Sequence, residues 1–146
     1  MRASKYNVHL RDATLDDLEL LEDLEVQIFP ADCLNSRSLE GELKRGFGGI
    51  YELEGRPVGY FLCRREHDLV DLLRLGILPD HRGKGIGQFL LQVVLRNSLK
   101  TMLTVRKDNE PALRLYRKHG FVIVGELDHA MPASVLIAER EEPFAG

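Results

Sequence analysis

The chain has 146 residues, of which 44% are hydrophobic and 29% charged, and its net charge is −3. This length fits a single domain spanning 1–146, which buries roughly 70% of the surface that its unfolded chain exposes. No apolar run reaches the ~18 residues needed to cross a bilayer, and no secretory signal is apparent, so we expect a cytoplasmic protein without a membrane partner. The negative net charge also disfavours binding to nucleic acid.

The first third of the sequence carries two helix signals. Thr14 followed by Asp17 resembles a capping box with Asp in the usual Glu place, and leucines at helical spacing follow it. Ser36 or Ser38 can cap a second helix, and GFGG predicts a turn after it. We therefore expect a strand at Tyr6–Arg11, a helix from Thr14 to about Gln27, a loop at Ala31–Ser36 and a helix ending near Gly46.

The rest of the chain predicts an antiparallel meander followed by a βαβαβ-like half. The expected elements are strands at Gly49–Leu53, Val58–Arg64 and Leu69–Ile77, a helix at Gly85–Ser98, a strand at Thr101–Val105, a helix at Glu110–His119 with Gly120 after it, strands at Phe121–Glu126 and Ala133–Ala138, and a frayed tail at 140–146. These elements form one mixed α/β sheet.

The segment RGKGIG combines glycines with positive charge where the helix expected at Gly85–Ser98 begins. Gly83, Gly85 and Gly87 clear side chains away from a helix N-terminus, whose free N–H groups attract anions, and Arg82 and Lys84 add charge. One interpretation is that this segment is a diphosphate-binding site. The other is that the glycines only make a tight turn and allow the helix to pack closely on the sheet.

The glycine spacing fits neither the Walker loop nor the GxGxxG dinucleotide motif. RGKGIG resembles instead the RxxGxG acyl-CoA signature of the GCN5-related N-acetyltransferase (GNAT) family, and DNEPALRLYRKHGF, Asp108–Phe121, resembles that family's second signature. The resemblance covers about residues 5–140. It implies acetyl-CoA as co-substrate and a mostly antiparallel sheet, flanked by helices and splayed between its fourth and fifth strands.

The resemblance also implies roles for individual residues. The backbone N–H of Leu75 would polarise the acetyl carbonyl, and the phenol of Tyr116 would protonate the departing thiolate. The implied cofactor-binding residues are Leu75, Ile77, Arg82, Gly83, Lys84, Gly85, Ile86, Gly87, Gln88, Asn109 and Tyr116. Asn109 could simply cap the helix that begins at Glu110, and Tyr116 could be a core or interface residue.

The general base is open. Asp71 aligns by spacing with the strand glutamate that serves as base in histone-type members, although it could be a solvated strand residue. The sequence also resembles the ribosomal-protein alanine N-acetyltransferase branch, in EVQIFPADCLNSRSLEGEL and LTVRKDN. That branch has a catalytic glutamate where this chain has Thr104. The general base is therefore Asp71, His67 or a water chain, or the amine binds in its neutral form and needs no base.

The remaining candidate ligands carry no metal pattern. Cys33 and Cys63 lack metal-ligand spacing, which favours incidental or buried thiols over a disulfide or a nucleophile. His9, His81, His119 and His129 lack mutual spacing and are expected at surface or packing positions. We expect no metal.

The leading hypothesis is direct transfer of acetyl from acetyl-CoA to a primary amine in a ternary complex, with a protein or peptide α-amine as acceptor. A second is a small-molecule amine such as a polyamine, an amino acid or an aminoglycoside, which Asp32, Glu40 and Glu42 would suit if they are not simply solvated. A third, motivated by Thr104, is a non-catalytic acyl-CoA-binding regulator. The negative net charge disfavours a toxin that acts on aminoacyl-tRNA. We expect the chain to be a monomer or a homodimer.

Overall fold

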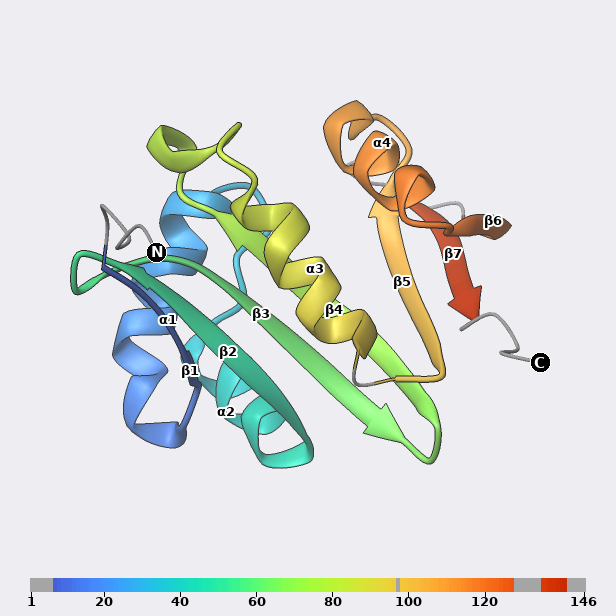
Figure 1. Ribbon diagram of the computed structural model, residues 1–146. Coiled ribbons are helices and arrows are strands. Elements are labelled where there is room, and N and C mark those ends of the chain that lie inside the picture. The colour runs from blue at the N-terminus through green and yellow to red at the C-terminus, as the bar shows by residue number, and fades with distance from the viewer. Residues whose placement is uncertain (1–6, 97, 128–134, 142–146) are drawn as a thin grey trace.

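The computed structural model of the protein describes residues 7–96, 98–127 and 135–141. Its centre is a sheet with the strand order β1-β2-β3-β4-β5-β7-β6, in which every neighbouring pair is antiparallel except β4 and β5 (Figure 1). The strands are β1 (Val8–Asp12), β2 (Gly46–Leu53), β3 (Arg56–Glu66), β4 (Leu69–Ile77), β5 (Lys100–Arg106), β6 (Val122–Leu127) and β7 (Val135–Glu141). The predicted mixed, mostly antiparallel sheet is confirmed.

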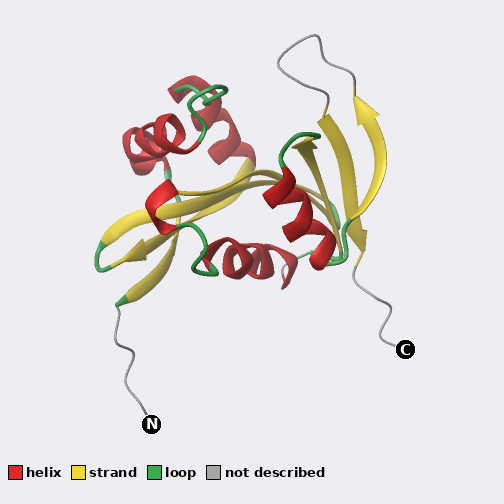
Figure 2. Cartoon of the chain, turned by 90° about the horizontal axis from the view of Figure 1, so that it is seen from above, coloured by secondary structure: helices red, strands yellow, loops and turns green. Residues whose placement is uncertain are grey.

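Helices cover both faces of the sheet (Figure 2). They are α1 (Leu18–Ile28), α2 (Ser36–Arg45), α3 (Ile86–Arg96) and α4 (Glu110–Lys118), with the short 3-10 helices η1 (Leu15–Asp17) and η2 (Pro79–His81). Side chains of α1 and α2 bury one face of the sheet, here called the α1/α2 face, and side chains of α3 and α4 bury the other, the α3/α4 face. None of the helices in the described ranges is long and apolar enough to span a membrane.

β4 and β5 separate along their length, as the resemblance implies. Their parallel pairing runs from Leu69 opposite Lys100 to Leu72 opposite Leu103 and ends there in the part of the chain that the structure describes. β4 continues to Ile77, held on its other side by β3, while β5 diverges from it (Figure 1). One edge of the second half of β4 is therefore open toward the splay.

A β-bulge lies at the point where this separation begins. Leu62 of β3 is opposite Arg74 and Cys63 is opposite Leu72, so Leu73 is the extra residue in β4. A bulge interrupts the strict alternation of side chains between the two faces of a strand. Leu73 packs on the α1/α2 core, and the following Arg74 also reaches α1, where it pairs with Glu25.

The predicted turn at GFGG is wrong, because these glycines lie inside β2. A Cβ built on Gly48 would lie 2.8 Å from both the Leu62 side chain and the Phe61 carbonyl oxygen of β3, and one on Gly49 would lie 2.5 Å from the Phe61 ring. The glycines thus let β2 pair closely with a bulky strand. The glycines that predicted a turn are instead required by the close approach of β2 to β3.

Several boundaries differ from the predictions, and the helix predicted to reach Ser98, for example, ends at Arg96. Asn35, not Ser36 or Ser38, caps α2, with its Oδ1 accepting a hydrogen bond of 2.9 Å from the backbone N–H of Ser38. Arg140 and Glu141 belong to β7 and not to a frayed tail, because they continue its pairing with β5, opposite Thr101 and Lys100. Tyr6, the predicted start of the last strand at Ala133 and residues 142–146 lie outside the described residues.

Other local predictions are confirmed. Asp17 accepts a hydrogen bond of 2.8 Å from the backbone N–H of Thr14, as a capping box requires, although the first turn after Thr14 is 3-10 and α1 begins only at Leu18. Gly120 ends α4 with a φ of +88°, the left-handed conformation expected just after a helix.

Candidate active site

A cavity of about 720 Å³ reaches both faces of the sheet where β4 departs from β5. α3, α4 and the turn before α3 form most of its wall, and the end of α1 supplies Ile28 and Phe29 from the opposite face. Its full lining is Ile28, Phe29, Leu75, Gly76, Ile77, His81, Arg82, Gly83, Gly85, Ile86, Gly87, Gln88, Asn109, Pro111, Ala112, Leu115 and Tyr116. Of the predicted site residues, only Lys84 and Asp71 are missing from this lining.

The glycine segment leads from η2 into α3 at the mouth of this cavity. Gly83 and Gly85 have φ values of +79° and +84°, and a Cβ at either position would meet open space. Glycine is therefore favoured here by the left-handed backbone conformation and not by steric crowding. The α3 hydrogen-bond ladder begins with Phe89 N–H to Gly85 C=O. The N–H groups that precede Phe89 have no partner within the helix and are available to an anion.

The alternative of close helix packing is not supported at Gly87. A Cβ there would make only ordinary contacts, 3.9 Å to Ile77 and 4.0 Å to Leu115. Arg82 stabilises the turn, because its Nε donates a 3.1 Å hydrogen bond to the Ile77 carbonyl. The segment therefore has the turn that one interpretation requires and the accessible, positively charged helix start that the other requires.

His81 is a cavity residue that the sequence reasoning assigned to surface or packing positions. Its Nδ1 is buried and has no hydrogen-bond partner among the residues that the structure describes. A buried polar atom without a partner costs free energy, so a ligand group in the cavity could supply the missing hydrogen bond. Its place directly before RGKGIG was the available sequence signal.

Leu75 and Ile77 lie on the half of β4 that is free of β5, and both line the cavity. Both side chains pack on the α3/α4 core, whereas Gly76 between them faces Ile28 and Phe29 of the α1/α2 face. The backbone at Leu75 therefore runs between the two sides of the cavity. The family resemblance implies an oxyanion contact at this backbone position.

Tyr116 contributes an aromatic alcohol to the wall. Its ring packs edge-on against Phe121, with 5.5 Å between the ring centroids. Burial raises the pKa of Tyr116 to about 12, so the phenol stays protonated at neutral pH. A protonated phenol at a cavity wall is suited to donate a proton to a basic leaving group.

Asn109 caps α4 and also lines the cavity. Its Oδ1 accepts a 3.3 Å hydrogen bond from the backbone N–H of Ala112. Pro111 in the first turn of the helix lines the same wall.

Asp71 lies on β4 before the bulge and outside the cavity lining. Leu75 is four positions further along the strand, which corresponds to roughly 13 Å. Burial raises the pKa of the Asp71 carboxyl, and nearby Arg64 opposes that shift. A base at Asp71 would need a water relay to act at Leu75.

Thr104, which cannot act as a base at neutral pH, and His67, the other side chain considered for this role, both lie outside the cavity lining. Thr104 is exposed on β5, and Asp71 is opposite Met102, two residues before it. His67 lies in the turn between β3 and β4, with a φ of +53°, at the end of β4 that is remote from the cavity. The position of His67 contradicts it as a direct base.

The acidic residues suggested for a cationic acceptor are engaged in ion pairs. Glu42 pairs with Arg64 at 2.6 Å and Glu40 with Lys44 at 3.0 Å, while Asp32 lies 3.8 Å from Arg74. None of the three lines the cavity. They do not form an acidic binding site for a small cationic amine.

Neither cysteine contributes to the cavity. Cys33 and Cys63 are both free thiols, the first exposed and the second buried. Burial raises the pKa of Cys63 to about 12, which keeps it an unreactive thiol.

The described residues contain no group of three or more His, Cys, Asp or Glu side chains placed to hold a metal, and His129 lies outside them.

A second, larger cavity of about 1020 Å³ lies between the C-terminal ends of α3 and α4. Its lining is mostly basic and polar, including Arg96, Lys118 and His119. No predicted site residue lines it, so the chemistry implied by the motifs belongs to the smaller cavity at the splay.

Comparison with known proteins identifies the family of this chain. Residues 11–121 match the family model described as Acetyltransferase (GNAT) family. A protein of Sulfurisphaera tokodaii named N-alpha-acetyltransferase is 33% identical over 98 residues, which cover 55% of this chain and 59% of that protein. One of the same name from Sulfolobus acidocaldarius is 31% identical over 149 residues, covering 86% of each. Matches to several other curated relatives span about half of their length.

Solved structures agree on the fold. The ribosomal-protein-S18-alanine N-acetyltransferase from Escherichia coli matches with a TM-score of 0.87 at 18% identity, covering 96% of this chain and 97% of that one. Arabidopsis thaliana Naa50, in complex with the bisubstrate analogue CoA-Ac-MVNAL, matches with a TM-score of 0.81 at 25% identity, covering 92% and 99%. The two signatures, the splayed sheet and the family match together show that this chain belongs to the GNAT acetyltransferase family.

Proposed function

We propose that the protein is an acetyl-CoA-dependent N-acetyltransferase that acetylates the α-amino group of a protein or peptide. The observation that carries this proposal is the cavity at the splay, because its lining combines a glycine turn suited to a diphosphate on one face of the sheet with apolar Ile28 and Phe29 on the other. Two substrates could then meet beside Leu75 without passing each other.

The α3 side of the cavity fits a coenzyme A diphosphate. Left-handed Gly83 and Gly85 leave the helix N–H groups uncovered, and Arg82 and Lys84 add positive charge at the same place. The open edge of β4 at Leu75 and Ile77 suits an extended chain such as pantetheine, which can pair with exposed backbone as a strand does. Acetyl-CoA supplies the acetyl thioester.

The transfer itself is a direct displacement. The amine nitrogen bonds to the acetyl carbon, the carbon–sulfur bond breaks, the amine loses one proton and the thiolate gains one. The N–H of Leu75 would stabilise the oxyanion that forms in between, and Tyr116 would protonate the departing sulfur. Reprotonation of Tyr116 from solvent completes the cycle.

The lack of a strong base favours an α-amine acceptor. The described residues lining the cavity include no carboxylate, and the carboxylate suggested by its spacing, Asp71, lies outside this lining and would need a water relay. At pH 7, deprotonating a free lysine costs about 4.6 kcal/mol, whereas an α-amine costs only about 1 to 1.4 kcal/mol. The names of the two N-alpha-acetyltransferase relatives and the peptide portion of the analogue bound to Naa50 support the same choice.

The test is release of free thiol from acetyl-CoA with three matched acceptors. The first is a peptide with a free α-amine and no lysine, the second the same peptide with a blocked α-amine and one internal lysine, and the third a polyamine. We expect turnover with the first and, at pH 7, at least about tenfold lower kcat/KM with the others. Preferred turnover of the lysine peptide or the polyamine would overturn the acceptor assignment, and acetyl-CoA binding without any turnover would favour the regulator.

A further inference from the structure

The segment 29–35 joins α1 to α2 and bounds the cavity from the α1/α2 face. It has no helical or strand hydrogen-bond ladder of its own beyond single turns, such as Asp32 N–H to Phe29 C=O at 3.2 Å. Phe29 is its cavity-lining side chain. Something outside the segment must therefore set the position of that ring.

Arg74 of β4 makes three contacts with this segment. Its guanidinium carbon lies 4.4 Å from the centroid of the Phe29 ring, its Nη2 donates a 2.6 Å hydrogen bond to the backbone carbonyl of Asp32, and its Nη1 lies 3.8 Å from the Asp32 carboxylate. A planar guanidinium can stack on an aromatic face and donate at its edge at the same time, which an ammonium cannot do.

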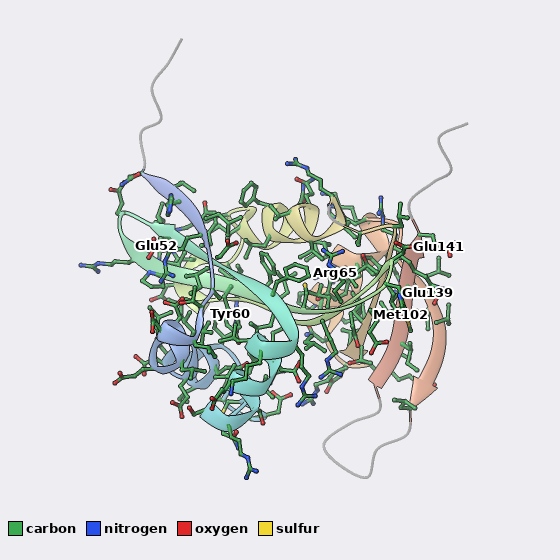
Figure 3. The ribbon with its side chains drawn as sticks, turned by 90° about the horizontal axis from the view of Figure 1, so that it is seen from below. Glu52, Tyr60, Arg65, Met102, Glu139 and Glu141 are labelled. Carbon is green, nitrogen blue, oxygen red and sulfur yellow. The ribbon has the colours of Figure 1, made fainter. Side chains whose placement is uncertain are left out.

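Glu25 of α1 fixes both Arg74 and the far end of the segment. Its side chain is fully buried, and its Oε1 accepts a 2.9 Å hydrogen bond from Arg74 Nε. Its Oε2 accepts a 3.3 Å hydrogen bond from the backbone N–H of Leu34. Tyr60, labelled in Figure 3, belongs to the same buried layer, where burial and the neighbouring Glu25 raise the pKa of its phenol.

Gly76 completes the arrangement by leaving room for the ring. A Cβ at this position would lie 2.9 Å from two ring atoms of Phe29 and 2.7 Å from Ile28. The Phe29 ring can thus lie against the bare backbone of β4, next to Leu75, while Arg74 covers it. The bulge at Leu73 makes this possible, because it turns Arg74 toward α1.

We infer that Arg74, held by buried Glu25, is a positioning residue that fixes Phe29 as the acceptor-side wall of the active site. This inference rests on the proposed function and assigns to Arg74 no contact with the reacting atoms. Loss of the Arg74 side chain should make segment 29–35 less ordered and weaken binding of the acceptor peptide. Acetyl-CoA binding on the other face should be unchanged.

The first experiment is steady-state kinetics of Arg74→Met with saturating acetyl-CoA and the α-amine peptide. We expect the peptide KM to rise by roughly tenfold, while kcat and the Kd of acetyl-CoA change by less than about twofold. Arg74→Lys should recover only part of this loss, because lysine restores the charge but not the planar stack. An unchanged KM, or an equal loss of acetyl-CoA affinity, would overturn the inference.

A matched control separates positioning from general damage. Arg11→Met removes another partly buried ion pair, in which Arg11 Nη2 lies 2.9 Å from Asp17, away from the cavity lining. It should leave the peptide KM unchanged. In a Phe29→Ala background, Arg74→Met should raise KM little further, because it acts through the ring it positions. Full additivity of the two substitutions would contradict that route.

Hydrogen exchange tests the inference independently of turnover. The backbone amides of Asp32 and Leu34 should exchange at least about tenfold faster in Arg74→Met, and those of α3 at an unchanged rate. If the wild-type protein acetylated no α-amine but this difference appeared, the proposed function would fail and the positioning role would stand. Unchanged exchange at both amides would refute the role of Arg74 even in an active enzyme.

Discussion

The two sides of the cavity are built in different ways. The side proposed for the cofactor, called the cofactor side, comes largely from one continuous segment, 81–88, and uses backbone conformation, with left-handed glycines and helix N–H groups that have no partner within α3. The side proposed for the acceptor, called the acceptor side, comes from residues far apart in the sequence, Glu25, Phe29 and Arg74, and uses a buried ion pair and a ring contact. Local sequence can specify the first, whereas the second exists only when α1 packs on β4.

This difference has an energetic consequence. Adding a methyl group at Gly85 would meet open space and strain only the turn, so the cofactor side should tolerate change with little loss of the fold. Glu25 is fully buried and Arg74 nearly so, and a charge left alone in such a place is costly. The acceptor side should therefore couple binding to stability more strongly than the cofactor side does.

The largest expected effect on the fold comes from breaking the buried pair. Glu25→Ala leaves Arg74 without its carboxylate and should lower the free energy of unfolding by about 3 kcal/mol. Glu42→Ala removes the more exposed pair with Arg64 and should cost less than about 1 kcal/mol. Urea denaturation of both variants tests this, and equal losses would remove the proposed contrast between the two sides.

The largest expected effect on chemistry comes from Tyr116. Tyr116→Phe should lower kcat by about 100-fold and leave the Kd of acetyl-CoA nearly unchanged, because the ring packing on Phe121 is retained. Tyr51→Phe, which alters a buried tyrosine outside the cavity lining, is the control. Stopped-flow kinetics at saturating acetyl-CoA is the measurement, and a kcat equal to that of the control would exclude Tyr116 as the acid.

The pH profile sharpens the same assignment. An acid must be protonated to act, and burial raises the pKa of Tyr116 to about 12, so its contribution is lost only as pH rises toward that value. We expect no decline of kcat from this group below about pH 10. An alkaline decline near neutral pH that disappears in Tyr116→Phe would contradict the raised pKa.

A smaller effect is expected on the cofactor side. Gly85→Ala places a Cβ on a residue with a φ of +84°, which costs roughly 1 to 2 kcal/mol in the left-handed region and should weaken acetyl-CoA binding by about tenfold. Gly55→Ala imposes the same kind of strain at a φ of +77°, in the β2–β3 turn. Calorimetric titration should show weaker binding in the first variant alone.

The smallest expected effect on stability concerns Asp71. Burial raises the pKa of its carboxyl above 3.8, so the folded state holds the proton more tightly than the unfolded state. Stability contributed by this group therefore falls as pH rises through the window between the two pKa values. Asp71→Asn should raise the Tm at pH 7 slightly, and the gain should disappear below about pH 3.8.

Activity decides whether Asp71 is also the relay base. A base must lose its proton, so wild-type kcat/KM should fall as pH falls through the raised pKa, and Asp71→Asn should lower kcat/KM at pH 7 by about tenfold. A variant that is more stable and fully active would make Asp71 a partly buried strand residue without a catalytic role.

Much of the fold was predictable because its signals are local. The Thr14–Asp17 cap, the leucine spacing of α1 and the glycine after α4 each depend on contacts within a few residues. GFGG misled because glycine serves both turns and close strand pairing, and only Leu62 and Phe61 of the neighbouring strand distinguish these uses. The cap at Asn35 was missed because two serines beside it have the same chemistry.

The sequence by itself determined the local structure on the side of the cavity proposed for the cofactor, because a glycine turn with basic residues at a helix start is a local property of RGKGIG. Only the tertiary structure decided the acceptor side. One bulge residue, Leu73, shifts the alternation of β4, so that Arg74 meets Glu25 and Phe29 on one face while Leu75 lines the cavity from the other. A one-residue change of strand register is set by pairing with β3, which no periodicity within β4 encodes.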